Sequence, residues 1–274
     1  MLDIRDLSLT LPRERGLPGE QGDLDILRGV SLAVASGEAV GLVGESGSGK
    51  SMTLRSILRI APPHATVTGG ITLDGTDVLA LTGEPLRLLR ARQVSMIAQN
   101  PHAVLNPVLP ISRYLAEGMH DAQGLPLKAA RLRAGELLER VGIDEVDRVL
   151  AAYPHQLSGG MLQRVVIAGA IAGEPQLMLA DEPTTALDVT TQAEVMAILD
   201  DCRRELGMAL LFVTHDLDLA AAVCDRIAVM KDGEIVESGV PEQLRDHPAH
   251  PYTRMLMDSR PAGILWSPDQ EGPR

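Results

Sequence analysis

The sequence predicts an α/β fold with a mostly parallel sheet, and three observations support this class. Short apolar segments typical of strands alternate with segments of helical periodicity over most of the 274 residues, as in repeated strand–helix–strand units. A glycine-rich loop joins one predicted strand to one predicted helix. A long helical stretch, at about residues 111–173, interrupts the alternation and predicts an inserted helical subdomain.

The elements of the first hundred residues are read from their periodicity and from the glycines and prolines between them. A Gly/Pro/charge segment at residues 12–22 predicts a loop between the first two strands, and residues 51–60 and 84–90 have helical spacing. Strands are expected at residues 2–11, 25–35, 38–44, 69–75 and 95–99.

Beyond residue 175 the alternation resumes. Residues 176–181 and 208–215 are expected to be strands, and residues 190–206 and 216–224 helices. A hairpin is predicted to turn at Asp232-Gly233, and the Pro/Gly-rich tail, residues 261–274, is expected to be flexible.

Composition excludes several classes of protein. The net charge is −12, from 25 basic and 37 acidic residues, which disfavours nucleic-acid binding because phosphate contacts need clustered Lys and Arg. Aromatic residues make up only 2% of the chain, so base-stacking platforms are not expected. No stretch approaches the roughly 20 apolar residues of a membrane-spanning helix, and the two cysteines do not form a zinc motif.

A phosphate cradle is the most specific motif of the sequence. It follows the pattern G-x-x-x-x-G-K-[ST], whose glycines let successive N–H groups point at one anion beside a helix N-terminus. In this pattern the lysine reaches the β- and γ-phosphates of a nucleotide and the following hydroxyl reaches Mg²⁺. The alternative is a flexible turn before a helix, which the flanking strand and helix disfavour. The motif and the residue after it are Gly44, Glu45, Ser46, Gly47, Ser48, Gly49, Lys50, Ser51 and Met52.

A second acidic site is expected where the strand at residues 176–181 ends in Asp181-Glu182. The carboxyl ends of parallel strands form the ligand edge of an open α/β sheet. Asp181 is expected to hold Mg²⁺, and Glu182 to polarise the water that attacks the γ-phosphate. The alternative is that this acidic pair caps the next helix.

The order of the remaining motifs resembles the ABC ATPase family over about residues 2–259. Leu157-Ser158-Gly159-Gly160-Met161 precedes Gln163-Arg164, Gln99 ends a predicted strand, Ala186-Leu187-Asp188 follows Glu182, and His215 ends another predicted strand. The resemblance implies a P-loop NTPase (RecA-like) core with an N-terminal antiparallel β part and an inserted α-helical subdomain. It also implies one ABC ATPase domain at residues 1–260, with the helical subdomain at about 100–172.

The resemblance implies ATP hydrolysis with Mg²⁺ by two paired ATPase chains. Ser158, Gly159 and Gly160 would bind the ATP of the opposite subunit, and Asp188 would line the subunit interface. Gln99 would contact Mg²⁺ and the attacking water, and His215 would hold the γ-phosphate near Glu182. The alternatives are an ordinary capped helix start for the serine–glycine segment and a plain helix-start histidine. Two positions depart from the family pattern: Leu11 stands where an aromatic residue usually stacks on adenine, and Met161 where most members have Gln.

Three stretches, residues 153–161, 181–192 and 247–252 (HPAHPY), resemble the oligopeptide, dipeptide and nickel importer branch. This branch implies two membrane-spanning permease partners, a second ATPase subunit and, indirectly, an extracytoplasmic solute-binding protein. It also implies a peripheral location at the cytoplasmic face of the cell membrane. One alternative is an accessory subunit of a soluble enzyme complex that resembles carbon–phosphorus lyase. Metal binding by His247 and His250 is disfavoured because Pro248 and Pro251 interrupt any helix there.

Overall fold

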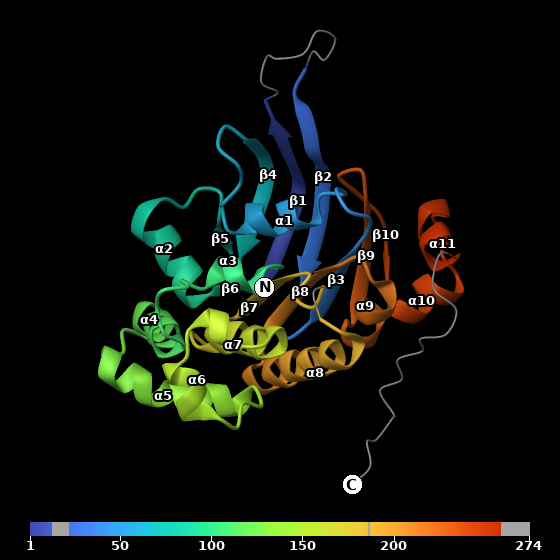
Figure 1. Cartoon of the computed structure of the whole chain (residues 1–274). Coiled ribbons are helices and arrows are strands. Elements are labelled where there is room, and N and C mark those ends of the chain that lie inside the picture. Colours follow the sequence, from blue (N-terminus) through green and yellow to red (C-terminus); the bar gives the residue numbers. More distant parts are fainter. Residues whose placement is uncertain (13–21, 186, 259–274) are drawn as a thin grey trace. The chain divides into compact units, whose positions relative to one another are not determined.

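The computed structural model describes residues 1–12, 22–185 and 187–258 (Figure 1). The predicted flexible tail, most of the predicted loop at residues 12–22, and Ala186 lie outside these ranges. Contacts divide the chain into two compact units. The first unit contains Met1–Leu81 and the chain from Leu211 onward, and the second unit is Thr82–Leu210.

In the first unit, an antiparallel sheet has the strand order β2-β1-β4-β5. Leu2, Ile4, Leu7 and Leu9 of the first strand are fully buried, because alternate residues of a strand face the same side of its sheet. This sheet confirms the predicted N-terminal antiparallel part. Its strands are β1 (Leu2–Leu11), β2 (Leu24–Val34), β4 (Thr66–Leu73) and β5 (Thr76–Asp77).

The rest of the first unit contains a parallel strand pair and short helices. Strand β3 (Ala39–Val43), buried throughout, pairs in parallel with β9 (Arg226–Lys231). Strand β10 (Glu234–Gly239) returns antiparallel to β9 after a turn with φ of 49° at Asp232 and 87° at Gly233, which confirms the predicted hairpin. The helices are α1 (Lys50–Ile57), α9 (Leu217–Val223), α10 (Pro241–Asp246) and α11 (Pro251–Asp258).

The second unit is mainly helical. Strand β6 (Val94–Ile97) pairs in parallel with β7 (Leu177–Asp181), and buried aliphatic side chains such as Leu115, Leu138 and Val166 join the helices that follow β6. Strand β8 (Ala209–Thr214) contains the division between the units. The helices are α2 (Gly83–Arg92), α3 (Pro101–Val104), α4 (Ile111–Gln123), α5 (Leu127–Arg140), α6 (Val146–Ala151), α7 (Gly159–Ile171) and α8 (Val189–Leu206), with a 3₁₀ turn at Pro154–Gln156.

The predicted α/β class with inserted helices is confirmed. Helices α4 to α7 lie within the helical stretch predicted at about residues 111–173, and Figure 1 shows them grouped together. The compact second unit is wider than residues 100–172, so the limits of an inserted subdomain stay a prediction. Within the described ranges, no helix is both long and apolar enough to cross a membrane.

Candidate active site

The predicted phosphate cradle forms the connection between β3 and α1. Gly44 follows the buried strand, and a Cβ on it would lie 2.1 Å from the carbonyl oxygen of Met230. Gly47 and Gly49 have φ of 83° and 107°, a region that side chains disfavour. The chain can therefore turn sharply here, and helix α1 begins at Lys50.

The ammonium group of Lys50 closes this loop on itself. Its Nζ donates to the carbonyl oxygens of Gly44 and Glu45, both at 2.7 Å, although only 4% of the residue is exposed. A buried cation is costly to desolvate unless it is hydrogen-bonded. The two hydrogen bonds stabilise the buried ammonium group beside the loop. Its positive charge can attract an anion there.

The loop fits a nucleotide phosphate and its metal ion. The hydroxyl of Ser48 is buried and has no hydrogen-bond partner among the described residues, and such groups require an explanation in a folded protein. A phosphate group in the cradle would supply an acceptor, and the first N–H groups of α1 would add to the site. Ser51, in the first turn of α1, is half-buried and offers the hydroxyl that an Mg²⁺ ion would need.

The second acidic site forms at the end of β7. Asp181 is the last residue of this strand and is 6% exposed. The carboxylate oxygen Oε2 of Glu182 accepts from Gln99 Nε2 at 3.2 Å and from Thr185 Oγ1 at 2.8 Å. Glu182 itself has a φ of 46°, a strained value for a non-glycine residue that occurs often at functional sites.

The sequence-based prediction that Gln99 ends a strand is wrong by two residues. The contact of Thr185 with Glu182 was not predicted. Strand β6 ends at Ile97, so Gln99 lies two residues beyond the strand and not at its end. The loop after β6 can therefore turn the side chain toward Glu182. Thr185 follows Glu182 by three residues, a spacing at which a hydroxyl can return to a nearby carboxylate, and this signal was available in the sequence.

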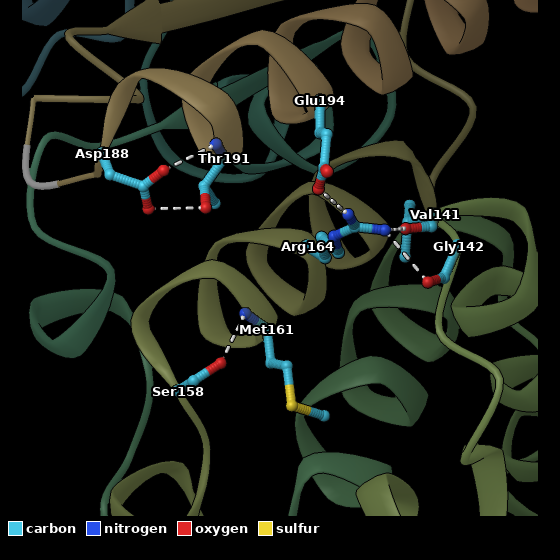
Figure 2. A network of polar contacts seen from close by, with 8 residues as sticks. All are labelled: Val141, Gly142, Ser158, Met161, Arg164, Asp188, Thr191 and Glu194. Atoms are coloured by element: carbon cyan, nitrogen blue, oxygen red, sulfur yellow. Dashed lines mark hydrogen bonds and ion pairs between the residues drawn. The ribbon is translucent and has the colours of Figure 1, made fainter. Parts of the chain in front are cut away.

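The serine–glycine segment that is predicted to form the second anion cradle lies at the start of helix α7, where Ser158 is the N-cap. Ser158 Oγ accepts from the N–H of Met161 at 3.3 Å and caps α7. The pKa of Asp188 lies below its ordinary value because the hydroxyl and N–H of Thr191 both donate to its carboxylate, at 2.7 and 3.1 Å. A Cβ on Gly160 would lie 2.8 Å from Thr191 Cγ2, so the first turns of α7 and α8 are in close contact. Figure 2 shows Asp188 and Thr191 together with Ser158 and Met161.

Arg164 links three elements around this cradle (Figure 2). Its Nη1 donates to the carbonyl oxygens of Val141 and Gly142, at 3.2 and 3.0 Å, and its Nη2 pairs with Glu194 of α8 at 2.7 Å. A cavity of about 710 Å³ opens beside these groups, and Ser158, Gly160, Asp188 and Arg164 are among its lining residues. The side chain of Arg164 thus ties α7 to α8 and to the end of α5.

The structure divides the predicted residues between the two compact units. The second unit joins Gln99 with Glu182, and Asp188 with the serine–glycine segment. The first unit contains the phosphate cradle and His215, which is exposed and follows β8 directly instead of ending it. The roles assigned to these individual residues stay predictions.

A glycine-rich loop closed by a buried lysine and an acidic pair at a strand end define a P-loop nucleoside triphosphatase. The family model described as "ABC transporter" matches residues 27–185. The chain belongs to the ABC transporter family and is an ATPase of this class, with ATP and Mg²⁺ as its nucleotide and metal ion.

Curated relatives align with nearly the whole chain. The Peptidoglycan transport ATP-binding protein YejF of Agrobacterium fabrum is 45% identical over 96% of this chain, which spans only 47% of that relative. The Oligopeptide transport ATP-binding protein OppD of Bacillus subtilis is 39% identical over 95% of this chain and 72% of its own length. The Probable D,D-dipeptide transport ATP-binding protein DdpD of Escherichia coli is 43% identical over 95% and 78%, respectively.

A solved structure has the same fold. The dimeric, post-hydrolysis state of the ATP-binding cassette MJ0796 bound to ADP and Pi has a TM-score of 0.76 and 30% identity. The match covers 88% of this chain and 99% of that one.

Proposed function

We propose that this chain is the ATP-hydrolysing subunit of an importer that takes up peptides or a related small solute, such as nickel. The observation that carries the proposal is that relatives named for oligopeptide and D,D-dipeptide transport align with 95% of the chain at 39% and 43% identity. ATP binding would close two paired ATPase subunits, and hydrolysis would reopen them. This cycle would drive uptake through partner permeases.

The residues of the first unit would bind the nucleotide. The backbone N–H groups of the loop and Lys50 would hold its β- and γ-phosphates, and the Ser51 hydroxyl would face the metal ion. The Mg²⁺ ion, when bound, neutralises phosphate charge. Met52, the next residue of α1, extends the predicted contact set.

The residues of the second unit would carry out the hydrolytic chemistry. Glu182 would polarise the attacking water, because its Oε2 atom is already oriented by Gln99 and Thr185. Asp181 and Gln99 would complete the metal site. His215, of the first unit, would hold the γ-phosphate in the hydrolytic arrangement.

A second ATPase chain, identical or related, is part of the proposal. Ser158, Gly159 and Gly160 at the start of α7 would bind the nucleotide of this opposite subunit, and Asp188 would line the interface. The other proposed partners are two membrane-spanning permease subunits and, indirectly, an extracytoplasmic solute-binding protein. The chain would act as a peripheral protein at the cytoplasmic face of the cell membrane.

Co-purification tests the proposal. A tagged chain is purified in mild detergent from its native cells, the partners are identified by mass spectrometry, and cells with the untagged chain provide the control. Two multi-spanning permeases are expected. A stable soluble complex without a membrane component would contradict the proposed transport function. It would favour an accessory subunit of an enzyme complex.

A further inference from the structure

The C-terminal HPAHPY segment, residues 247–252, has a defined place in the first unit. It leads from α10 into α11, and Figure 1 shows both helices beside the β9–β10 hairpin. The proposed transport function assigns no role to the residues of this segment. In the sequence, the segment serves only as a feature typical of the importer branch.

Hydrogen bonds hold this segment in one arrangement. The carboxylate of Glu237, on β10, accepts from the N–H groups of Ala249 and His250 at 2.8 and 2.9 Å. The Nδ1 atom of His250 in turn accepts from the N–H of Tyr252 at 3.1 Å. These acceptors satisfy donors at the start of α11 that have no partner inside the helix. The start of α11 is therefore tied to β10.

The fixed segment delivers Tyr252 to the phosphate cradle. Tyr252 is 4% exposed, and its hydroxyl oxygen accepts from the backbone N–H of Glu45 at 3.0 Å. Glu45 is the second residue of the cradle, and its carbonyl oxygen accepts from Lys50. One peptide unit on each side of Glu45 is thus held, by Tyr252 on one side and by Lys50 on the other.

Strand β9 supports the same contact. Lys231, its last residue, places Nζ 5.0 Å from the centroid of the Tyr252 ring, a favourable cation–π distance. Met230, the residue before it, approaches Gly44 so closely that a Cβ there would lie 2.1 Å from its carbonyl oxygen. The end of β9, the tyrosine ring and the first turn of the cradle therefore pack as one cluster.

We propose that Tyr252 is a positioning residue for the nucleotide site, which holds the entry of the phosphate cradle in its binding conformation from the C-terminal helix. The inference rests on the proposed function of the cradle as an ATP site. A cradle that is already ordered loses less conformational freedom when it binds, so its affinity is higher. Burial raises the pKa of Tyr252, against a smaller opposite effect of the Glu45 N–H, so the phenol is uncharged at neutral pH.

The test is Tyr252→Phe in the full chain, which removes one hydroxyl and retains the ring under Lys231. Binding of Mg·ADP is measured by calorimetric titration, and exchange of the Glu45 amide hydrogen is measured without nucleotide. The net contribution of one hydrogen bond corresponds to about a fivefold change in an equilibrium constant. We expect about fivefold weaker binding and clearly faster exchange at Glu45, a raised KM for ATP with little change in kcat, and a nearly unchanged melting temperature.

Two reference variants separate the possible failures. Tyr114→Phe removes the hydroxyl of a half-buried tyrosine on α4, in the second unit, and is expected to bind nucleotide normally. Lys50→Ala reports on the cradle itself. Wild-type binding by Tyr252→Phe, together with weak binding by Lys50→Ala, would overturn the role of Tyr252 alone. Wild-type binding by Lys50→Ala would overturn the cradle assignment. A lower melting temperature with unchanged affinity would make Tyr252 a structural residue only.

Discussion

The side-chain amide of Gln99 donates to a carboxylate oxygen of Glu182 over 3.2 Å, although 83 residues separate the two in the sequence. The same oxygen accepts from the hydroxyl of Thr185 at 2.8 Å. Two donors on one oxygen keep the carboxylate in one orientation. Substitutions of Glu182 and of Thr185 therefore test the role of this carboxylate.

Replacing Glu182 by Gln is expected to abolish turnover and to retain ATP binding. The amide keeps the size of the side chain but cannot take up a proton, and a general base contributes about 10²- to 10⁴-fold to rate. ATPase assays and nucleotide titration measure the two effects. Glu174→Gln, on an exposed carboxylate paired with Arg133, is the matched control. Undiminished hydrolysis by Glu182→Gln would falsify the assigned role.

Thr185→Val is expected to lower kcat about fivefold, the usual contribution of one hydrogen bond, without a change in ATP affinity. The substitution preserves shape but removes the donor to Glu182. Thr185→Ser restores the hydroxyl and should recover most of the rate. If both variants lose activity equally, the loss comes from packing and not from the orientation of Glu182.

Lys50→Ala is expected to weaken nucleotide binding by about 10- to 100-fold, the usual range for hydrogen bonds to a charged group. The two carbonyl oxygens that accept from Lys50 also lose their donor, so the cradle becomes less ordered. Calorimetric titration with Mg·ADP checks the affinity. Lys128→Ala, on the exposed face of α5, is the control, and equal affinity in the two variants would contradict the prediction.

Gly142→Ala is expected to destabilise the protein more than Gly124→Ala does. Both glycines have nearly equal φ, 73° and 72°, so both variants incur a backbone penalty of about 1 kcal/mol. Only at Gly142 would the new Cβ also meet Arg164, 2.6 Å from its Nη1, whereas Gly124 has open space. Displacing that guanidinium should cost about 1 kcal/mol more.

Chemical unfolding of the two glycine variants provides the comparison. Because the backbone strain is matched, the difference between them reports on Arg164 and its contacts with α5 and α8. Equal destabilisation would mean that Arg164 moves aside without losing its hydrogen bonds.

Stability is expected to fall in acid partly through Glu237. Burial opposes ionisation of this carboxyl, but the neighbouring Thr253 hydroxyl and the N–H groups of Ala249 and His250 outweigh it and lower its pKa from 4.5. A lowered folded-state pKa stabilises the protein fully above the unfolded-state value and loses this contribution as the pH falls through the folded-state value. The relevant window therefore lies below about pH 4.5.

The measurement is the free energy of unfolding of the wild type and of Glu237→Gln between about pH 3 and pH 6. The two should differ near pH 6 and converge in acid, where the wild-type carboxyl is protonated. A constant difference over the whole range would show that ionisation of Glu237 does not contribute.

Local features of the sequence were sufficient to predict most elements of the fold. The glycines and Lys50 mark the junction of β3 and α1, Ser158 marks the start of α7, and Asp232-Gly233 marks the hairpin turn. Each depends on residues that are neighbours in the chain, through backbone conformation, periodicity or a cap. The ends of β6 and β8 were each predicted too late, since the apolar pattern continues past the last paired residue.

The contacts of the candidate site required the tertiary structure. Gln99 contacts Glu182, and Arg164 joins α7 with α8 through Glu194, but no spacing in the sequence predicts these two pairs. Tyr252 reaches the N–H of Glu45 from 207 residues away. The sequence by itself determined the order of the elements and the chemical groups at their ends, because these depend on short-range conformation. Only the tertiary structure decided which groups orient one another, because packing brings together residues that are distant in the chain.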